Sequence, residues 1–94
     1  MSGRNTMKIL KVLSRSGGEI FGTNSGSWFP TGTQLPEPRV EFELLTLSVQ
    51  IFNCTCNTWT VRNMVKAGYL EPTDKPNTFR MTDFGRQIVN KENI

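Results

Sequence analysis

The chain has 94 residues, a net charge of +3 at pH 7, a pI near 9.2 and no histidine. This length suits one domain with a modest core, and no apolar run approaches the ~20 residues of a membrane span. The basic start is not followed by the apolar segment that a signal peptide requires. We therefore expect one soluble, cytoplasmic domain over residues 1–94, with no membrane partner.

The composition favours neither an enzyme nor a metal-binding protein. Without histidine, general-base chemistry would fall to carboxylates, cysteine or lysine, and the carboxylates form no recognisable pair. Cys54 and Cys56 have no charged neighbour in sequence that would lower a thiol pKa. Two thiols cannot complete the usual four-ligand zinc set. We expect no catalytic residue, no metal and no cofactor.

The charge is distributed unevenly along the chain. Residues 1–18 carry four cations and no carboxylate, residues 19–43 have a net charge of −3, and residues 54–91 have a net charge of +3. Such a pattern fits a protein that turns one face to a polyanion, although scattered solubilising charge would give the same totals.

Residues 5–16 show the spacing of an amphipathic helix, with Asn5 or Thr6 as its cap and Gly17–Gly18 as its end. One side of this helix is apolar and the other is basic. The basic stripe is either a solvated outer face or a set of phosphate contacts. It consists of Arg4, Lys8, Lys11 and Arg15.

Residues 16–38 hold many glycines and prolines and predict a long loop or insertion, unless they hide a hairpin. Glu19–Phe21 could form a short strand within this stretch. Trp28 and Phe29 are more typical of side chains that anchor a loop to the core than of ligand-binding residues. Residues 39–52 fit both a strand and a helical stripe, and we favour a helix at 41–52.

Asn53 can cap a further helix at 54–67, which Gly68 would end. One side of this helix is apolar and the other carries cations, an amide, a hydroxyl and an indole without any carboxylate. A hairpin follows, with turn residues at 72–77. Thr82 then caps a last helix to Asn90, and the tail 91–94 is expected to fray.

The segment Ala67–Gly68–Tyr69–Leu70, the hairpin, and the stretch from Phe79 to Arg86 (FRMTDFGR) together resemble the winged helix-turn-helix family. The resemblance covers residues 53–89. It implies an α+β winged helix-turn-helix domain of three or four helices, with a C-terminal β-hairpin wing and a long loop between helix 1 and helix 2. Residues 41–52 would be the second helix, 54–67 the recognition helix and 71–78 the wing.

Two functions are open at this point. The first is sequence-specific binding of double-stranded DNA by a small transcriptional or phage-type regulator, because Arg and Asn pair with base edges in the major groove. The second is a winged-helix adaptor or inhibitor that binds a host or partner protein through exposed aromatics. A homodimer is plausible, because one small reader covers only a short half-site. The candidate DNA-binding residues are Thr55, Trp59, Arg62, Asn63, Lys66, Lys75, Asn77 and Arg80.

Overall fold

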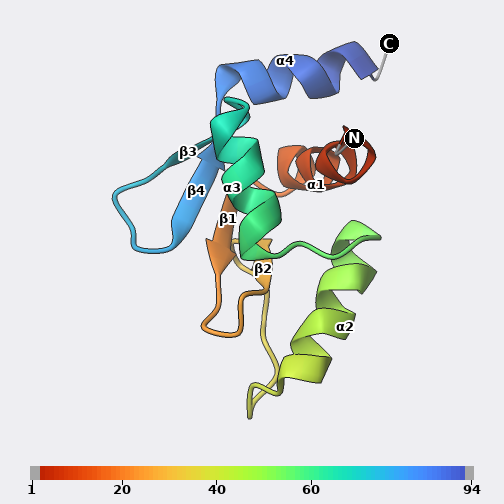
Figure 1. Ribbon diagram of the computed structural model, residues 1–94, viewed down its shortest axis with the longest axis vertical. Coiled ribbons are helices and arrows are strands. Elements are labelled where there is room, and N and C mark those ends of the chain that lie inside the picture. Colours follow the sequence, from red (N-terminus) through yellow and green to blue (C-terminus); the bar gives the residue numbers. More distant parts are fainter. Residues whose placement is uncertain (1–2, 93–94) are drawn as a thin grey trace.

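The computed structural model describes residues 3–92 as four helices and four short strands (Figure 1). In chain order these are α1 (Gly3–Arg15), β1 (Glu19–Gly22), β2 (Trp28–Pro30), α2 (Glu41–Phe52), α3 (Thr58–Lys66), β3 (Leu70–Pro72), β4 (Thr78–Met81) and α4 (Asp83–Glu92). Of the predicted tail, residues 91–92 continue α4, and residues 93–94 lie outside the described part.

All four strands belong to one antiparallel sheet with the order β2-β1-β4-β3. Two hairpins, β1–β2 and β3–β4, are joined because β1 pairs with β4, with Ile20 opposite Phe79. Strands from the two ends of the chain therefore lie side by side in the middle of the sheet (Figure 1).

This sheet overturns the predicted winged helix-turn-helix domain with a C-terminal wing and a long loop after the first helix. Residues 70–81 do not form a separate wing, because β4 is a central strand that pairs on both sides. The predicted loop at 16–38 instead contains β1 and β2, so the alternative of a hidden hairpin is confirmed, with the possible strand at 19–21 as part of β1. The fold is an α+β domain in which four helices and a four-stranded antiparallel sheet are interleaved along the chain.

The helix bounds correct two predicted caps. Helix α1 begins at Gly3, so Asn5 and Thr6 lie inside it rather than at its start. Helix α2 covers 41–52 as favoured, but Asn53 ends it in a left-handed conformation (φ 59°) instead of starting the next helix. Helix α3 begins only at Thr58, after Asn57, whose side chain accepts a hydrogen bond from the Thr60 amide at 2.9 Å.

The main core lies between the inner face of the sheet and the helices. Ile20, Leu70 and Met81 point to this face from three strands, and α1 and α3 cover it with apolar side chains. Its buried members are Ile9, Leu10, Leu13, Ile20, Trp28, Phe52, Cys56, Val61, Met64, Leu70, Met81 and Val89. Since side chains alternate along a strand, the residues between these positions point to the outer face.

The last helix starts as the sequence predicted. The Thr82 hydroxyl accepts a hydrogen bond from the Gly85 amide at 3.0 Å and donates one to the Gly68 carbonyl. Gly68 itself has a positive φ of 86° and follows α3, which is the usual conformation of a glycine at a helix end. Thr82 therefore ties the start of α4 to the end of α3.

Within residues 3–92, every helix is too short or too polar to cross a membrane.

Candidate interaction surface on helix α3

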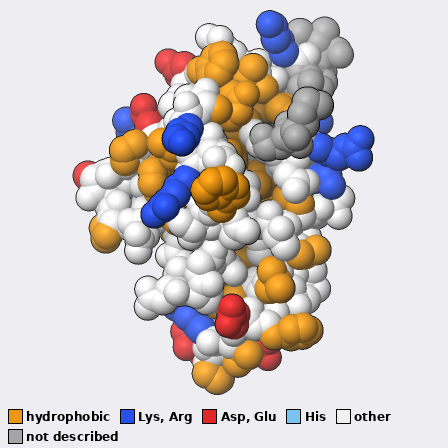
Figure 2. All heavy atoms as spheres, in the orientation of Figure 1, with side chains coloured by type: hydrophobic (Ala, Val, Ile, Leu, Met, Phe, Trp, Pro, Cys, Tyr) orange, Lys and Arg blue, Asp and Glu red, His pale blue; other side chains and the backbone are white. Residues whose placement is uncertain are grey.

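One face of α3 is exposed and carries four of the eight predicted site residues. Trp59 lies three and four residues before the adjacent Arg62 and Asn63, which lie four and three residues before Lys66, so the four side chains form a single stripe along the helix. We call these four residues the α3 stripe. Val61 and Met64 are both 1% exposed and anchor the opposite side in the core, whereas Trp59 is 70% exposed. Figure 2 shows Lys and Arg side chains close to a hydrophobic side chain on the face over α3.

The start of α3 is held firmly against the β1–β2 hairpin. The indole nitrogen of Trp28 donates a hydrogen bond to the Thr58 hydroxyl at 3.1 Å. The Trp28 amide donates to the Cys56 carbonyl at 3.0 Å, and Ser27 forms an isolated β-bridge with Asn57. The exposed stripe is thus presented by a helix whose first turn is capped and fixed, which favours a preorganised contact surface.

A small hollow of about 150 Å³ lies beside Trp59. It is lined from two helices, with Asn5 and Thr6 on α1 and with Trp59, Thr60 and Asn63 on α3. Its lining residues include two amides and two hydroxyls, which can both donate and accept hydrogen bonds. Asn5 was predicted only as a helix cap, because no local pattern in the sequence brings the start of α1 beside α3.

Lys75 and Arg80 do not join the α3 stripe. Arg80 lies between Phe79 and Met81, which face the core, so its side chain points to the outer face of the sheet. There its Nε lies 2.7 Å from Glu71 Oε2, and this hydrogen bond together with the carboxylate charge raises the pKa of Arg80. Lys75 Nζ lies 3.7 Å from Glu19 Oε1, directly across from Arg80 in the sheet. Both cations already have carboxylate partners.

The two remaining predicted residues lie in connecting segments. Thr55 is exposed in the link between α2 and α3, rather than on the recognition helix that the resemblance implied. Asn77 is exposed in the β3–β4 turn with a positive φ of 50°, and its carbonyl accepts a hydrogen bond from the Gly22 amide at 2.9 Å. Four of the eight predicted residues are therefore brought together, all on α3.

The buried thiol of Cys56 shows why the cysteines are poor nucleophiles. Burial, and then the nearby Cys54, raise the pKa of Cys56 from the usual 9.0 to about 12. The Cys54 pKa is also raised, by burial, although Lys8 opposes the shift. Since the thiolate is the reactive form, neither site favours nucleophilic chemistry. Among residues 3–92, His, Cys, Asp and Glu form no group of three that could hold a metal ion.

The raised pKa of Cys56 predicts a loss of stability at alkaline pH. The unfolded chain ionises Cys56 above pH 9.0, whereas the folded chain keeps the proton to about pH 12, so the free energy of unfolding falls across this window. The slope from this one group is up to about 1.4 kcal/mol per pH unit. Urea unfolding below and above pH 9.0 measures it, and Cys56→Ala should give a shallower decline. Equal slopes for both proteins would contradict the assignment.

Comparisons with known proteins give no significant match for this chain, whether to a family model, to a curated protein or to a solved structure.

Proposed function

We propose that the protein binds double-stranded DNA in a sequence-specific manner through the α3 stripe, as a small transcriptional regulator. The observation that carries the proposal is an exposed helix face with two cations, an amide and an indole and with no carboxylate anywhere on the helix. An α-helix fits the major groove of B-DNA, where base edges present distinct donor and acceptor patterns.

The members of the stripe have separate roles in this proposal. Arg62 and Asn63 are adjacent near the middle of α3, where the side chains reach base edges; Arg pairs with guanine and Asn with adenine. Lys66, in the last turn, contacts a phosphate and thereby fixes the position of the helix on the duplex. Trp59 lies over the sugar-phosphate backbone at the other end. The amides of Asn5 and Asn63 in the hollow beside it offer further hydrogen bonds to a phosphate.

The proposal is restricted to α3 and does not require the β3–β4 turn. Lys75 and Arg80 contact Glu19 and Glu71 on the outer face of the sheet. Releasing them for phosphate would leave these carboxylates close to DNA, and that repulsion would cost affinity. Arg80 is therefore a suitable control position, because its loss removes one positive charge without touching the α3 stripe.

Fluorescence anisotropy tests the proposal with two kinds of labelled duplex, a pool of random sequence and a site selected from that pool for tight binding. We expect Arg62→Ala to weaken binding of a selected site by about 1–3 kcal/mol and to relax its sequence preference. Lys66→Ala should weaken all duplexes alike and reduce the salt slope by about one phosphate contact. Arg80→Ala should leave both quantities near those of the unmodified protein. Binding that is absent at low salt, or that falls equally in all three variants, would reject the α3 stripe as the DNA-binding surface.

The exposure of Trp59 favours a second candidate, a binding surface for a protein partner. An indole that is 70% exposed on a fixed helix is the kind of side chain that dominates protein interfaces. By contrast, Trp28 and Phe29 are 6% and 0% exposed, so they cannot contact a protein partner without local unfolding. Retention on heparin separates the candidates, since a DNA-binding surface should be retained in a salt-dependent manner and a protein-binding surface should pass through.

A further inference from the structure

Helix α2 exposes a second surface of a different chemical kind. Phe42, Leu45 and Val49 are 74%, 45% and 41% exposed, and their spacing places them on one side of the helix. We call them the α2 stripe. The other side is held by Leu44 and Phe52, each 1% exposed. In Figure 1, α2 lies at the lower end of the molecule, away from α4 and the β3–β4 hairpin. A row of large apolar side chains in water is a common sign of an interface.

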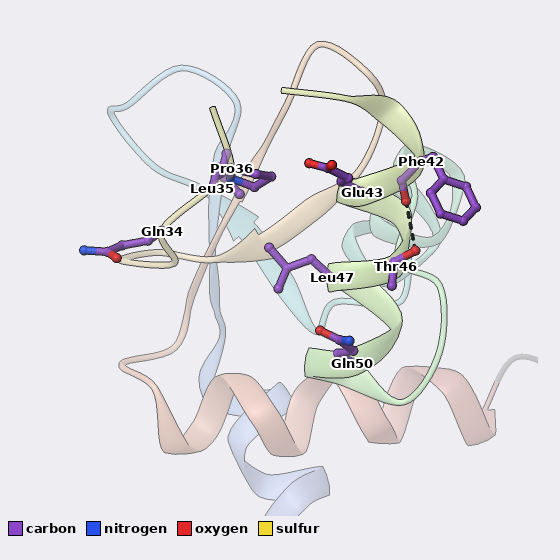
Figure 3. Close-up of a pocket in the computed structure, with 8 residues that line it drawn as sticks. All are labelled: Gln34, Leu35, Pro36, Phe42, Glu43, Thr46, Leu47 and Gln50. Carbon is purple, nitrogen blue, oxygen red and sulfur yellow. Dashed lines mark hydrogen bonds between the residues drawn. The ribbon is translucent and has the colours of Figure 1, made fainter. Parts of the chain in front are cut away.

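A groove borders this stripe and is not filled by it. The groove has a volume of about 520 Å³ and lies between α2 and residues 34–36. In Figure 3, Leu47 and Glu43 extend toward this segment, whereas the ring of Phe42 points away from it. Phe42 therefore packs neither in the core nor against the neighbouring loop of its own chain, and its ring is available to another molecule.

The two ends of α2 carry opposite charge. Glu41 and Glu43 are exposed in the first turn. At the other end, Lys8 from α1 donates a hydrogen bond from Nζ to the carbonyl of Asn53 at 3.3 Å. Lys8 belongs to the basic stripe of α1 that the sequence showed, with Arg4 and Lys11 one turn before and after it. Helix α2 thus starts with two carboxylates and ends beside a cation of α1.

We infer that the α2 stripe binds a second copy of this chain, with the two α2 helices antiparallel about a two-fold axis near Leu45. In that arrangement Leu45 packs on Leu45 of the second copy, and Phe42 of each copy packs on Val49 of the other. The acidic start of each helix then lies beside the basic end of its partner. The inference is independent of DNA binding, because α3 takes no part in the contact.

The choice of a second copy follows from self-complementarity. A two-fold interface uses the same patch on both subunits, so the patch must match itself after inversion of the helix direction. The α2 stripe does so, because Phe42 and Val49 lie about one turn before and after Leu45, and because the two ends of α2 have charged neighbours of opposite sign. A patch of this modest size predicts a weak or transient dimer, with a dissociation constant in the micromolar to millimolar range.

Sedimentation equilibrium of the full chain over a range of concentrations tests the inference. We expect the average mass to rise above the 10.6 kDa of one chain, and Leu45→Asp to raise the dissociation constant at least ~10-fold, because a buried charge without a partner is costly. Leu45 is exposed, so the variant should keep its fold, which circular dichroism checks. Trp59→Ala is the matched control on α3 and should leave association unchanged. A single-chain mass up to about 1 mM, or equal loss in both variants, overturns the inference.

Disulfide crosslinking then tests the antiparallel direction. The background is Cys54→Ser, which leaves Cys56 buried at 2% exposure. Phe42→Cys and Val49→Cys are made separately in this background, one with a cleavable tag, and are mixed under oxidising conditions. Antiparallel helices bring position 42 of one copy to position 49 of the other, so mixed disulfides should dominate. A parallel pair would give only like-with-like disulfides, and this result, or no crosslink at all, overturns the inference.

Discussion

Trp28→Ala is expected to lower the free energy of unfolding by about 3–5 kcal/mol. The indole is 6% exposed, packs with its ring centre 5.6 Å from that of Phe79, and donates a hydrogen bond to Thr58. Truncation leaves a cavity between the sheet and α3 and an unpaired hydroxyl at the start of α3. A domain of this size has about 5–15 kcal/mol in total, so the variant should unfold at a much lower urea concentration.

Trp59→Ala provides the matched control for this prediction. The same side chain is removed, but Trp59 is 70% exposed, and the change in stability should stay within about 0.5 kcal/mol. Urea unfolding monitored by far-ultraviolet circular dichroism suits both variants, because that signal comes mainly from the helical backbone and not from tryptophan fluorescence. A similar loss in the two variants would mean that the β1–β2 hairpin does not pack against α3 as described.

Trp28 also shows where the sequence was insufficient for the fold. The composition of residues 16–38 predicted a long loop and left a hairpin only as an alternative, because strands of three or four residues give too short a pattern among glycines and prolines. These strands exist because β1 pairs with β4, about 60 residues further along the chain, and long-range pairing leaves little local trace. By contrast, α2, the β3–β4 turn and the Thr82 cap depend on neighbouring residues and were predicted correctly.

The same distinction between local and long-range features applies to the residues of the candidate site. The α3 stripe was predictable because its members share one helix face, and helical spacing is a local property. The orientation of Arg80 was not, since it depends on which face of the sheet the core occupies, and a one-residue change of register would reverse it. The same holds for Asn5, which approaches Trp59 only because α1 packs beside α3. Local spacing thus predicts a stripe, whereas only the tertiary fold decides which stripes share a surface.

Gly85→Ala is expected to lower the free energy of unfolding by about 1–3 kcal/mol, although alanine is the better helix former. In an unconstrained helix the change would stabilise by about 1 kcal/mol. Here a Cβ at position 85 would lie 2.6 Å from the carbonyl oxygen of Tyr69. That oxygen cannot move away easily, because it accepts a hydrogen bond from the Thr82 amide at 3.0 Å. The added methyl group therefore forces α4 away from the chain segment that follows α3.

A control on the same helix separates the clash from helix propensity. Gln87 is exposed on α4, so Gln87→Ala should change stability by no more than about 0.5 kcal/mol. The displacement of α4 should also disturb the stacked rings of Tyr69 and Phe84, whose centres are 5.4 Å apart, and this would alter their proton chemical shifts in Gly85→Ala alone. A Gly85→Ala protein that is more stable than the parent would show that α4 can shift without cost. The contact between Gly85 and Tyr69 would then not hold α4 in place.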